Sequence, residues 1–340
     1  MAKLGEVCLL KAGKFVSAND ISPEYNKGLY PCFGGNGIRG YVADYTHDGE
    51  FPLIGRQGAL CGNVNLASGK FHATEHAVVV QPKIEMNVHW LYYALNAMNL
   101  GQYATGAAQP GLAVSKLETL SIEIPNISEQ NKIAQTLYKV EQLVNFRKQQ
   151  LAKLDELVKA RFVEMFGDPI GNTKNLPVTK FVDVVKMQRG FDLPVQERKS
   201  DGMIPVYGSN GVLGYHDISK VKGGGVITGR SGTIGKVFYE KGEFWPLNTT
   251  LFSLNLHGND VVYLKYLLEL FDLSRFTEGT GVPTLNRNKF HDELIIDVPL
   301  DEQERFAAFV ERVDQQKQTV QQSLEKLELM KKALMQEYFG

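Results

Sequence analysis

The stretch EQNKIAQTLYKVEQLVNFRKQQLAKLDELVKARFVEMF, from Glu129 to Phe166, decides the architecture of this chain. Apolar or long-stemmed residues recur in it with spacings of four and three, and neither glycine nor proline interrupts it, which is typical of a heptad seam. We expect Ser128 to cap this helix and Gly167, followed by Pro169, to end it. A helix of 38 residues would be about 57 Å long, so it needs a partner for its seam. The seam residues are Ile133, Leu137, Val140, Val144, Arg147, Leu151, Leu154, Val158, Arg161 and Met165.

A partner of the same length lies at the end of the chain, from Glu302 to Phe339. Its own seam again has spacings of four and three, and both ends lie 173 residues after those of the first stretch. Asp301 with Glu304 resembles a capping box. The second seam consists of Phe306, Val310, Val313, Lys317, Val320, Leu324, Leu327, Lys331, Leu334 and Tyr338. We expect Arg147, Arg161, Lys317 and Lys331 to fix the helix register or reach outward to solvent.

The regions that precede the two helices are also duplicated. Residues 30–45, YPCFGGNGIRGYVADY, match 204–219, IPVYGSNGVLGYHDIS, and IGRQGALCGNV (54–64) matches TGRSGTIGKV (228–237). A repeat of this length indicates duplicated domains rather than a solenoid. We therefore expect a domain at 1–127, a spacer helix at 128–168, a second domain at 169–300 and a second spacer helix at 301–340.

Each domain reads as α+β. Short apolar or alternating runs at 78–80, 225–228 and 251–254 are separated by Gly, Asn and Asp, which predicts strands. Helical spacing predicts helices at 89–98 and 261–271, and each is followed by a loop, at 105–116 and 279–289.

Composition sets broad limits on the function. The 340 residues carry 37 basic and 38 acidic side chains, so contact with nucleic acid would depend on local clustering. Three well separated cysteines without a CxxC pair suit a reducing cytoplasm. No run of 18 apolar residues suggests a membrane span, and the first ten residues lack the design of a signal peptide.

Apparent catalytic motifs are weak. GRSGTIGKV has five residues between Gly229 and Gly235 where a phosphate-binding P-loop has four, and Val237 stands where Ser or Thr would ligate magnesium. HATEH (72–76) has the spacing of one class of zinc peptidases, but it runs into a predicted strand, whereas His72 and His76 would need one helix face. We expect no cofactor and no catalytic constellation.

The duplicated order of these motifs resembles the specificity (S) subunits of type I restriction-modification systems. The resemblance covers nearly the whole chain and rests on RGFDLP (189–194), IPVYGSNGVLGY (204–215), TGRSGTIGKV, the GAAQPGL loop (106–112) and the paired helices that end in Phe-Gly. In the first domain RGFDLP has only a loose counterpart, AGKFVS (12–17). The chain is somewhat short for the family, so a specificity subunit of a related type II system that cuts beside a bipartite site stays open.

The resemblance implies two target recognition domains joined by two antiparallel coiled-coil helices with pseudo-two-fold symmetry. Each domain would read half of a split double-stranded DNA target. The helices would dock methyltransferase (M) subunits, expected to number two, and restriction (R) subunits in a complex that also cleaves. The chain itself would carry no catalysis, and two other classes stay open: a metallohydrolase that uses His72 and His76, and a scaffold that binds protein or glycan.

We expect the DNA face of each domain to consist of its glycine-rich loop and of the loop that carries Gln109 (105–116) or Arg287 (279–289). Arginine and lysine suit phosphate or guanine, and glutamine and asparagine suit adenine. Asparagine followed by glycine is also typical of a hairpin turn. The candidate DNA-binding residues are Asn36, Arg39, Arg56, Gln57 and Gln109 in the first domain and Asn210, Arg230, Ser231, Lys236, Arg287 and Lys289 in the second.

Overall fold

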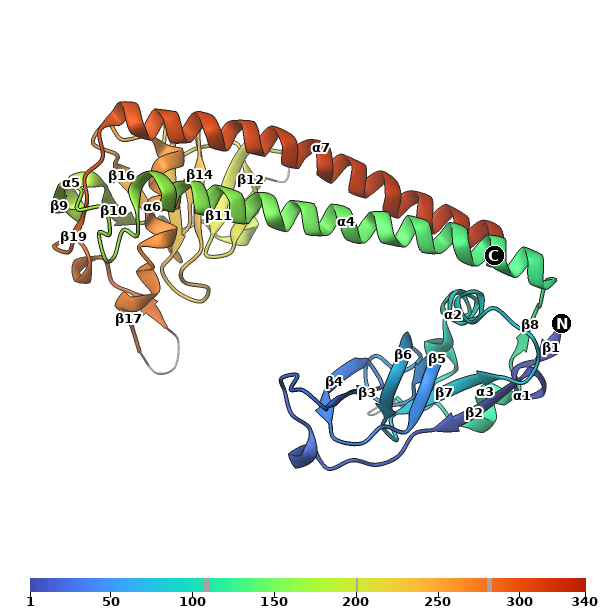
Figure 1. Cartoon of the computed structure of the whole chain (residues 1–340). Coiled ribbons are helices and arrows are strands. Elements are labelled where there is room, and N and C mark those ends of the chain that lie inside the picture. Colours follow the sequence, from blue (N-terminus) through green and yellow to red (C-terminus); the bar gives the residue numbers. More distant parts are fainter. Residues whose placement is uncertain (107–109, 200, 280–282) are drawn as a thin grey trace. The chain divides into compact units, whose positions relative to one another are not determined.

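The computed structural model describes residues 1–106, 110–199, 201–279 and 283–340. The chain forms two compact units: unit 1 is Met1–Arg147 with Ser323–Gly340, and unit 2 is Lys148–Gln322. Each unit thus combines one α+β domain with part of each long helix, α4 (Ile127–Phe166) and α7 (Leu300–Phe339) (Figure 1). The compact units divide both helices, whereas the predicted domain boundaries follow the chain, so these boundaries stay a prediction.

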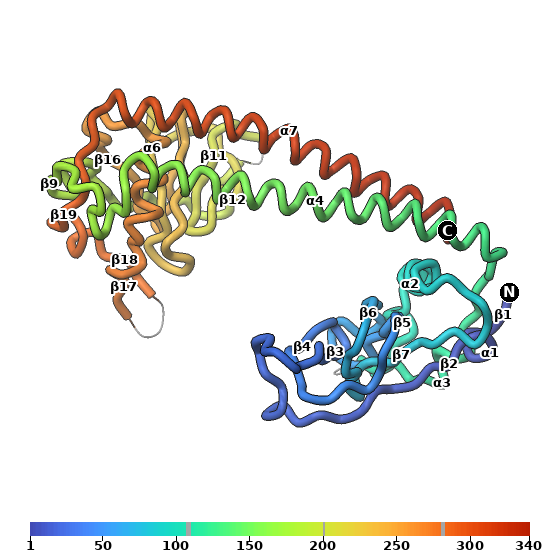
Figure 2. The backbone as a smooth tube through the Cα atoms, viewed as in Figure 1, coloured from blue at the N-terminus to red at the C-terminus, as the bar shows by residue number. Residues whose placement is uncertain are grey.

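The heptad seam is confirmed. All twenty predicted seam residues are buried or half-buried, and none is exposed. Within each unit, higher residue numbers of α4 meet lower numbers of α7, as at Glu141–Lys331 and Asp155–Lys317, so the helices are antiparallel (Figure 2). Burial of these apolar stripes against each other explains why two polar, 40-residue helices persist.

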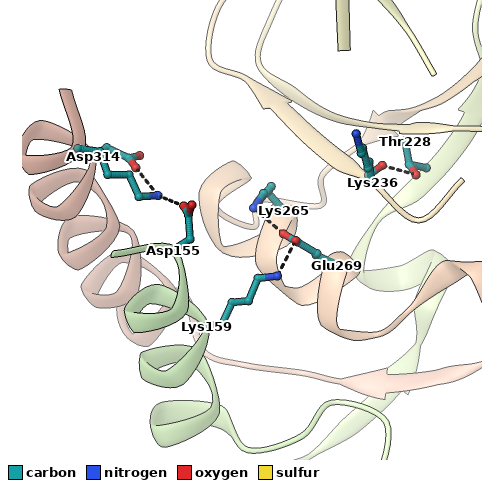
Figure 3. Close-up of polar contacts among 8 residues, drawn as sticks. Asp155, Lys159, Thr228, Lys236, Lys265, Glu269 and Asp314 are labelled. Atoms are coloured by element: carbon teal, nitrogen blue, oxygen red, sulfur yellow. Dashed lines mark hydrogen bonds and ion pairs between the residues drawn. The ribbon is translucent and has the colours of Figure 1, made fainter. Parts of the chain in front are cut away.

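The polar seam residues contact the facing helix, and the expectation that they fix the register stays a prediction. In unit 1, Lys331 Nζ lies 2.7 Å from Glu141 Oε1, and Arg147 Nε donates to Ser323 Oγ at 3.2 Å. In unit 2, Lys317 bridges Asp155 and Asp314 (Figure 3).

Arg161 lies with its guanidinium over the Phe309 ring, 5.8 Å from the centroid. The four seam cations are therefore occupied by contacts within or between the helices.

The predicted N-terminal caps of the two long helices are wrong, whereas the predicted end of the first one is confirmed, because α4 ends at Phe166 and Gly167 has a φ of 76°. The helix α4 begins at Ile127, and the backbone N–H of Glu129 donates to Asn126 Oδ1 at 3.0 Å, so Asn126 is the cap and Ser128 lies in the first turn. The helix α7 begins at Leu300, which places Asp301 inside the helix. The carbonyl of Pro299 accepts the first bonds there, from 302 and 303, instead of a capping box.

Within the described residues, unit 1 contains one six-stranded sheet in the order β2-β7-β5-β6-β3-β4 and a two-stranded sheet β1-β8. Neighbouring strands are antiparallel, apart from the parallel pair β3–β6. The strands are β1 (Ala2–Lys3), β2 (Cys8–Ala12), β3 (Tyr30–Gly34), β4 (Gly37–Val42), β5 (His47–Gly55), β6 (Val64–Ala73), β7 (Ala77–Pro82) and β8 (Ser121–Ile122), and the short helices are α1 (Leu4–Val7), η1 (Ala18–Asp20), α2 (Val88–Ala97), η2 (Leu100–Tyr103) and α3 (Val114–Glu118).

Unit 2 largely repeats this order of elements, but two strands, β14 and β15, replace the long strand β6. It also has the strand pair β17–β18 after η4, and η5 in place of α3. Its main sheets are therefore four-stranded, β10-β16-β13-β14, and three-stranded, β12-β11-β15. The strands are β9 (Val178–Lys180), β10 (Lys186–Arg189), β11 (Ile204–Gly208), β12 (Gly211–His216), β13 (Gly225–Gly229), β14 (Val237–Glu240), β15 (Trp245–Pro246), β16 (Thr250–Asn255), β17 (Thr277–Glu278), β18 (Thr284–Leu285) and β19 (Leu294–Ile296), and the short helices are α5 (Phe181–Val184), η3 (Val195–Glu197), α6 (Val261–Leu270), η4 (Leu273–Phe276) and η5 (Arg287–Lys289).

The break between β14 and β15 has a local cause. The segment 241–243, KGE, lies opposite the glycines at 223 and 224, which lowers strand propensity on both sides. Glu243 turns its carboxylate toward Ser219 Oγ, at 2.7 Å, and toward Lys222.

Each domain buries one helix against its sheet and against the long helices. In unit 1, Trp90 and Leu91 of α2 share a core with Ile133 and Leu137 of α4. In unit 2, the ring of Phe162 on α4 packs against Tyr263, Phe306 and Phe166 with centroids 5.0 to 5.8 Å apart. The predicted helices at 89–98 and 261–271 are thus confirmed to within one residue at each end.

The loose counterpart AGKFVS has the same place in unit 1 as RGFDLP in unit 2. The N–H of Gly13 donates to Ala77 O at 3.0 Å, and the N–H of Gly190 donates to Thr250 O at 3.1 Å. A Cβ at Gly13 would lie 2.0 Å from Ala73 O, so this close backbone approach requires glycine.

The predicted loops are partly structured. The loop expected at 105–116 runs into α3, and the one expected at 279–289 contains β18 and η5. Within the described residues no helix combines the length and apolarity needed to cross a bilayer.

Candidate nucleic-acid interface

The tip of the β3–β4 hairpin forms one side of the candidate site in unit 1. Asn36 lies in the turn between the strands, and its Oδ1 accepts a bond from Asn63 Nδ2 at 2.9 Å. In unit 2, Asn210 lies in the equivalent turn, and its Oδ1 accepts from Lys236 Nζ at 2.9 Å. Both asparagines are therefore turn residues, each held by a side chain of the glycine-rich loop that follows.

The glycine-rich loop reaches this tip through a close backbone approach. A Cβ at Gly55 would lie 2.0 Å from the carbonyl oxygen of Gly35, so a larger residue cannot stand there without moving the backbone. The next residue, Arg56, donates its N–H to His76 O at 3.0 Å and accepts from Leu112 N at 2.9 Å. The hairpin tip, the loop 55–63, the turn at His76 and residues 110–112 thus come together.

The hairpin tip, the loop and the turn at His76 line an open surface hollow of about 500 Å³ in unit 1. Three predicted DNA-binding residues, Asn36, Arg39 and Gln57, line it together with His76. Nearby, Arg56 is half-buried, and its Nε is buried with no hydrogen-bond acceptor among the described residues. The hollow presents these polar side chains beside the apolar Ile38, on a backbone fixed by glycines.

Unit 2 builds the same framework with other side chains. Arg230 donates its N–H to Thr249 O at 2.8 Å and accepts from Leu285 N at 2.7 Å, as Arg56 does in unit 1. Ser231 forms a β-bridge with Thr284, which brings the 284 segment to the loop. Two sequence-diverged sites therefore share one arrangement of backbone hydrogen bonds.

Comparison with known proteins identifies a family that has this duplicated arrangement. The family described as the type I restriction modification DNA specificity domain matches residues 1–156 and again residues 174–329. The chain belongs to this family.

Relatives of the chain carry the same description. It is 53% identical over 143 residues to the type I restriction enzyme EcoprrI specificity subunit of Escherichia coli, a match that covers 42% of this chain and 36% of that subunit. It is 27% identical over 323 residues to a putative type I restriction enzyme specificity subunit of Haemophilus influenzae, which covers 84% of this chain and 80% of the relative. The chain thus spans little more than a third of the first of these relatives and most of the second.

Solved specificity subunits share the fold. The crystal structure of the type I restriction-modification system S subunit from M. genitalium aligns with a TM-score of 0.69 at 18% identity, over 99% of this chain and 95% of that one. A chain from a study of assembly and conformational transition of the type I R-M system aligns with a TM-score of 0.58 at 13% identity, over 99% and 96%. The α+β domains and paired long helices are those of type I specificity subunits.

Other predicted residues of this specificity-domain protein lie in different surroundings. Arg230 Nε donates to Asn248 O at 3.2 Å. In η5, Arg287 donates to Met187 O at 3.4 Å, and Lys289 lies 3.1 Å from Glu278. Gln109 lies outside the described residues.

Two residues of the site were not predicted from the sequence pattern. Asn63 was not singled out, although it aligns with Lys236 at the offset of 173. His76 was assigned to a metal motif, although it lies in the hollow. The histidine itself was a signal, but only the fold shows which histidine of HATEH faces the site.

The metal-site alternative is wrong. His72 lies in the strand β6 and is buried, with its ring nitrogens 3.2 and 3.3 Å from the backbone carbonyls of Lys14 and Asp44. A strand followed by a turn cannot present His72 and His76 on one helix face. In the part of the chain that the structure describes, no group of three or more His, Cys, Asp or Glu could hold a metal ion.

The apparent P-loop and the cysteines give no catalytic site either. The strand β13 ends at Gly229, and the loop leads into the strand β14 rather than into a helix. Burial raises the pKa of the Cys8 thiol to about 11 and also raises the pKa of Cys32 and Cys61. At neutral pH these thiols stay protonated and are weak nucleophiles.

Proposed function

We propose that this chain is the non-catalytic DNA-specificity subunit of a restriction-modification complex. Its two units would each read one half of a bipartite double-stranded target. The supporting observation is the shared pattern of backbone hydrogen bonds, from Arg56 to His76 in unit 1 and from Arg230 to Thr249 in unit 2. This common frame carries different side chains in the two units. Two homologous sites on one framework suit related ligands that differ in detail.

The long helices would dock the catalytic subunits. In unit 1 the helices expose large apolar side chains: Leu143 is 46% exposed, Phe146 60%, Leu329 67% and Met330 52%. Such a group of exposed apolar side chains on paired helices suits contacts with helices of a partner protein. Because the recognition units are duplicated, we propose two M subunits, and R subunits where the complex also cleaves.

The test is to co-express the full chain with the methyltransferase encoded beside it and to sequence the modified bases in host DNA. The expected result is one asymmetric split sequence, modified in both parts. Methylation that does not depend on this chain, or a target without a gap, would contradict the proposal. Cleavage beside the target by the same complex would identify the related type II arrangement.

A control with the purified chain addresses catalysis. We expect no methyl transfer from S-adenosylmethionine, no DNA cleavage and no ATP hydrolysis without partner subunits. Salt-sensitive binding to duplex DNA separates the proposal from a scaffold for protein or glycan, because phosphate contacts release counterions.

A further inference from the structure

One equivalent position at the two hairpin tips carries a charged side chain in unit 1 and an apolar side chain in unit 2. Both hairpins have a register shift in their first strand just before the turn. A Cβ at Gly34 would lie 2.5 Å from Cδ of Arg39, and a Cβ at Gly208 would lie 2.3 Å from Cδ1 of Leu213. Arg39 and Leu213 therefore occupy equivalent positions in the two hairpins, each across from the equivalent glycine, and both are exposed.

At the neighbouring positions, too, the two units carry chemically different side chains. Gln57 in unit 1 corresponds to Ser231 in unit 2, because each follows the arginine that anchors the loop. His76 corresponds to Thr249, because each carbonyl accepts the N–H of that arginine. Unit 1 thus presents a guanidinium, an amide and an imidazole, where unit 2 presents a branched alkyl group and two hydroxyl groups.

We propose that this hairpin position reads one base pair in each half-site, with Arg39 selecting guanine in one and Leu213 selecting the methyl group of thymine in the other. The proposal rests on the proposed function, since it assigns the base contact of the same surface. Arginine is the side chain that binds O6 and N7 of guanine in the major groove as a fork. The thymine methyl is the apolar group that the major groove offers to an apolar side chain.

The leucine at this position favours contact with a base over contact with a phosphate. A position that contacts phosphate needs a hydrogen-bond donor, and leucine has none. Leu213 is nevertheless 56% exposed at the tip, beside Val212 at 46%. An apolar tip on a surface that binds DNA favours contact with base edges, and the shared frame extends that inference to Arg39.

The experiment uses the full chain with its methyltransferase and a library of randomised targets, with methylated sequences counted. Arg39→Leu should lose preference for guanine at one position of one half-site by about 5- to 150-fold. Leu213→Arg should lose preference for thymine and gain preference for guanine at one position of the other half-site. Arg312→Leu removes the same group from an exposed position on α7 and should change neither half-site.

A second variant guards against simple loss of folding. Arg39→Lys keeps the positive charge but not the planar fork. It should keep the salt dependence of DNA binding and still lose guanine preference at that one position. Unchanged preference in Arg39→Lys and Arg39→Leu would overturn the proposal. Equally weaker methylation of all sequences would also overturn it and would indicate a phosphate contact.

The wild-type sample separates this inference from the proposed function. If the wild-type complex selects no split sequence, the proposed function fails. If it selects one, and exchange of Arg39 and Leu213 leaves both half-sites unchanged, only the base assignment fails.

Discussion

The two units show which parts of a duplicated recognition domain can change. Their backbone bonds are equivalent, as at Arg56–His76 and Arg230–Thr249, and glycine stands at the close approaches of Gly13, Gly55, Gly190 and Gly229. In contrast, Arg39 is replaced by Leu213 at the hairpin tip, and the long strand β6 is split in unit 2. Backbone contacts preserve the site, so its side chains can vary without loss of the fold.

The helical pair shows a similar contrast at equivalent positions. Val158 of α4 is fully buried in the core of unit 2. Its counterpart 173 residues later is Lys331 of α7, which is half-buried and pairs with Glu141 in unit 1. The same seam position is apolar against one domain and ionic against the other.

The largest expected effect on stability comes from placing the lysine of the unit 1 seam at the equivalent position of unit 2. Val158→Lys would bury an ammonium group without a partner and should lower the free energy of unfolding by about 4 kcal/mol or more. Lys331→Val should change it by no more than about 1 kcal/mol, because that pair is partly hydrated. Urea unfolding of both variants measures the difference, and equal effects would contradict it.

The aromatic core of unit 2 gives the next contrast. Phe162 is fully buried, whereas its counterpart in unit 1, Met335, is half-buried. Phe162→Ala should cost about 3 kcal/mol or more, and Met335→Ala no more than about 2 kcal/mol. If denaturation gave the larger loss for Met335→Ala, the end of α7 would be packed more tightly than its exposure indicates.

A smaller effect is expected from exchanging the side chains that hold the hairpin turns. Lys236→Asn gives unit 2 the pair found in unit 1, and Asn63→Lys does the reverse. If Lys236 contacts a phosphate, its removal should reduce the slope of log affinity against log salt by about 0.9, and Asn63→Lys should increase it by a similar amount. Titration of duplex DNA at several salt concentrations measures both slopes, with Lys153→Asn, an exposed change on α4, as control.

The smallest effect concerns acid sensitivity. The N–H of Met187 donates to His291 Nε2 at 3.3 Å, and burial, with Arg287 and Lys186 nearby, lowers the pKa of His291 below its usual value. The unfolded chain therefore binds the proton more readily, so this contribution to stability is present above about pH 6.5 and is lost as the pH falls below it.

His291→Gln should remove this part of the acid sensitivity. Its melting temperature should fall less than that of the wild type between about pH 7.5 and about pH 5.5, on either side of the usual histidine pKa. The counterpart of His291 in unit 1 is Glu118, which is exposed, so Glu118→Gln is the matched control. An equal fall in the wild type and His291→Gln would show that protonation of His291 does not contribute.

Sequence alone identified the features that repeat or have a period. The seam residues follow a heptad, and two such stripes bury each other when they face one another, so all twenty could be predicted. The duplication at an offset of 173 or 174 likewise predicted the paired turns at Asn36 and Asn210. Local choices were less certain, since Asn126 and Ser128 are both good caps and the chain's entry into the helix selects between them.

Only the tertiary structure decided which residues meet at the site. The hollow forms because Gly55 approaches Gly35 and because Arg56 bonds to the turn at His76, contacts between segments about 20 residues apart that no local pattern specifies. The spacing in HATEH is compatible with either a helix or a strand, and the pairing of β6 with β3 and β5 made it a strand, which buried His72 and left His76 at the hollow. Period and repetition are properties of the chain, whereas the meeting of distant side chains depends on long-range backbone pairing.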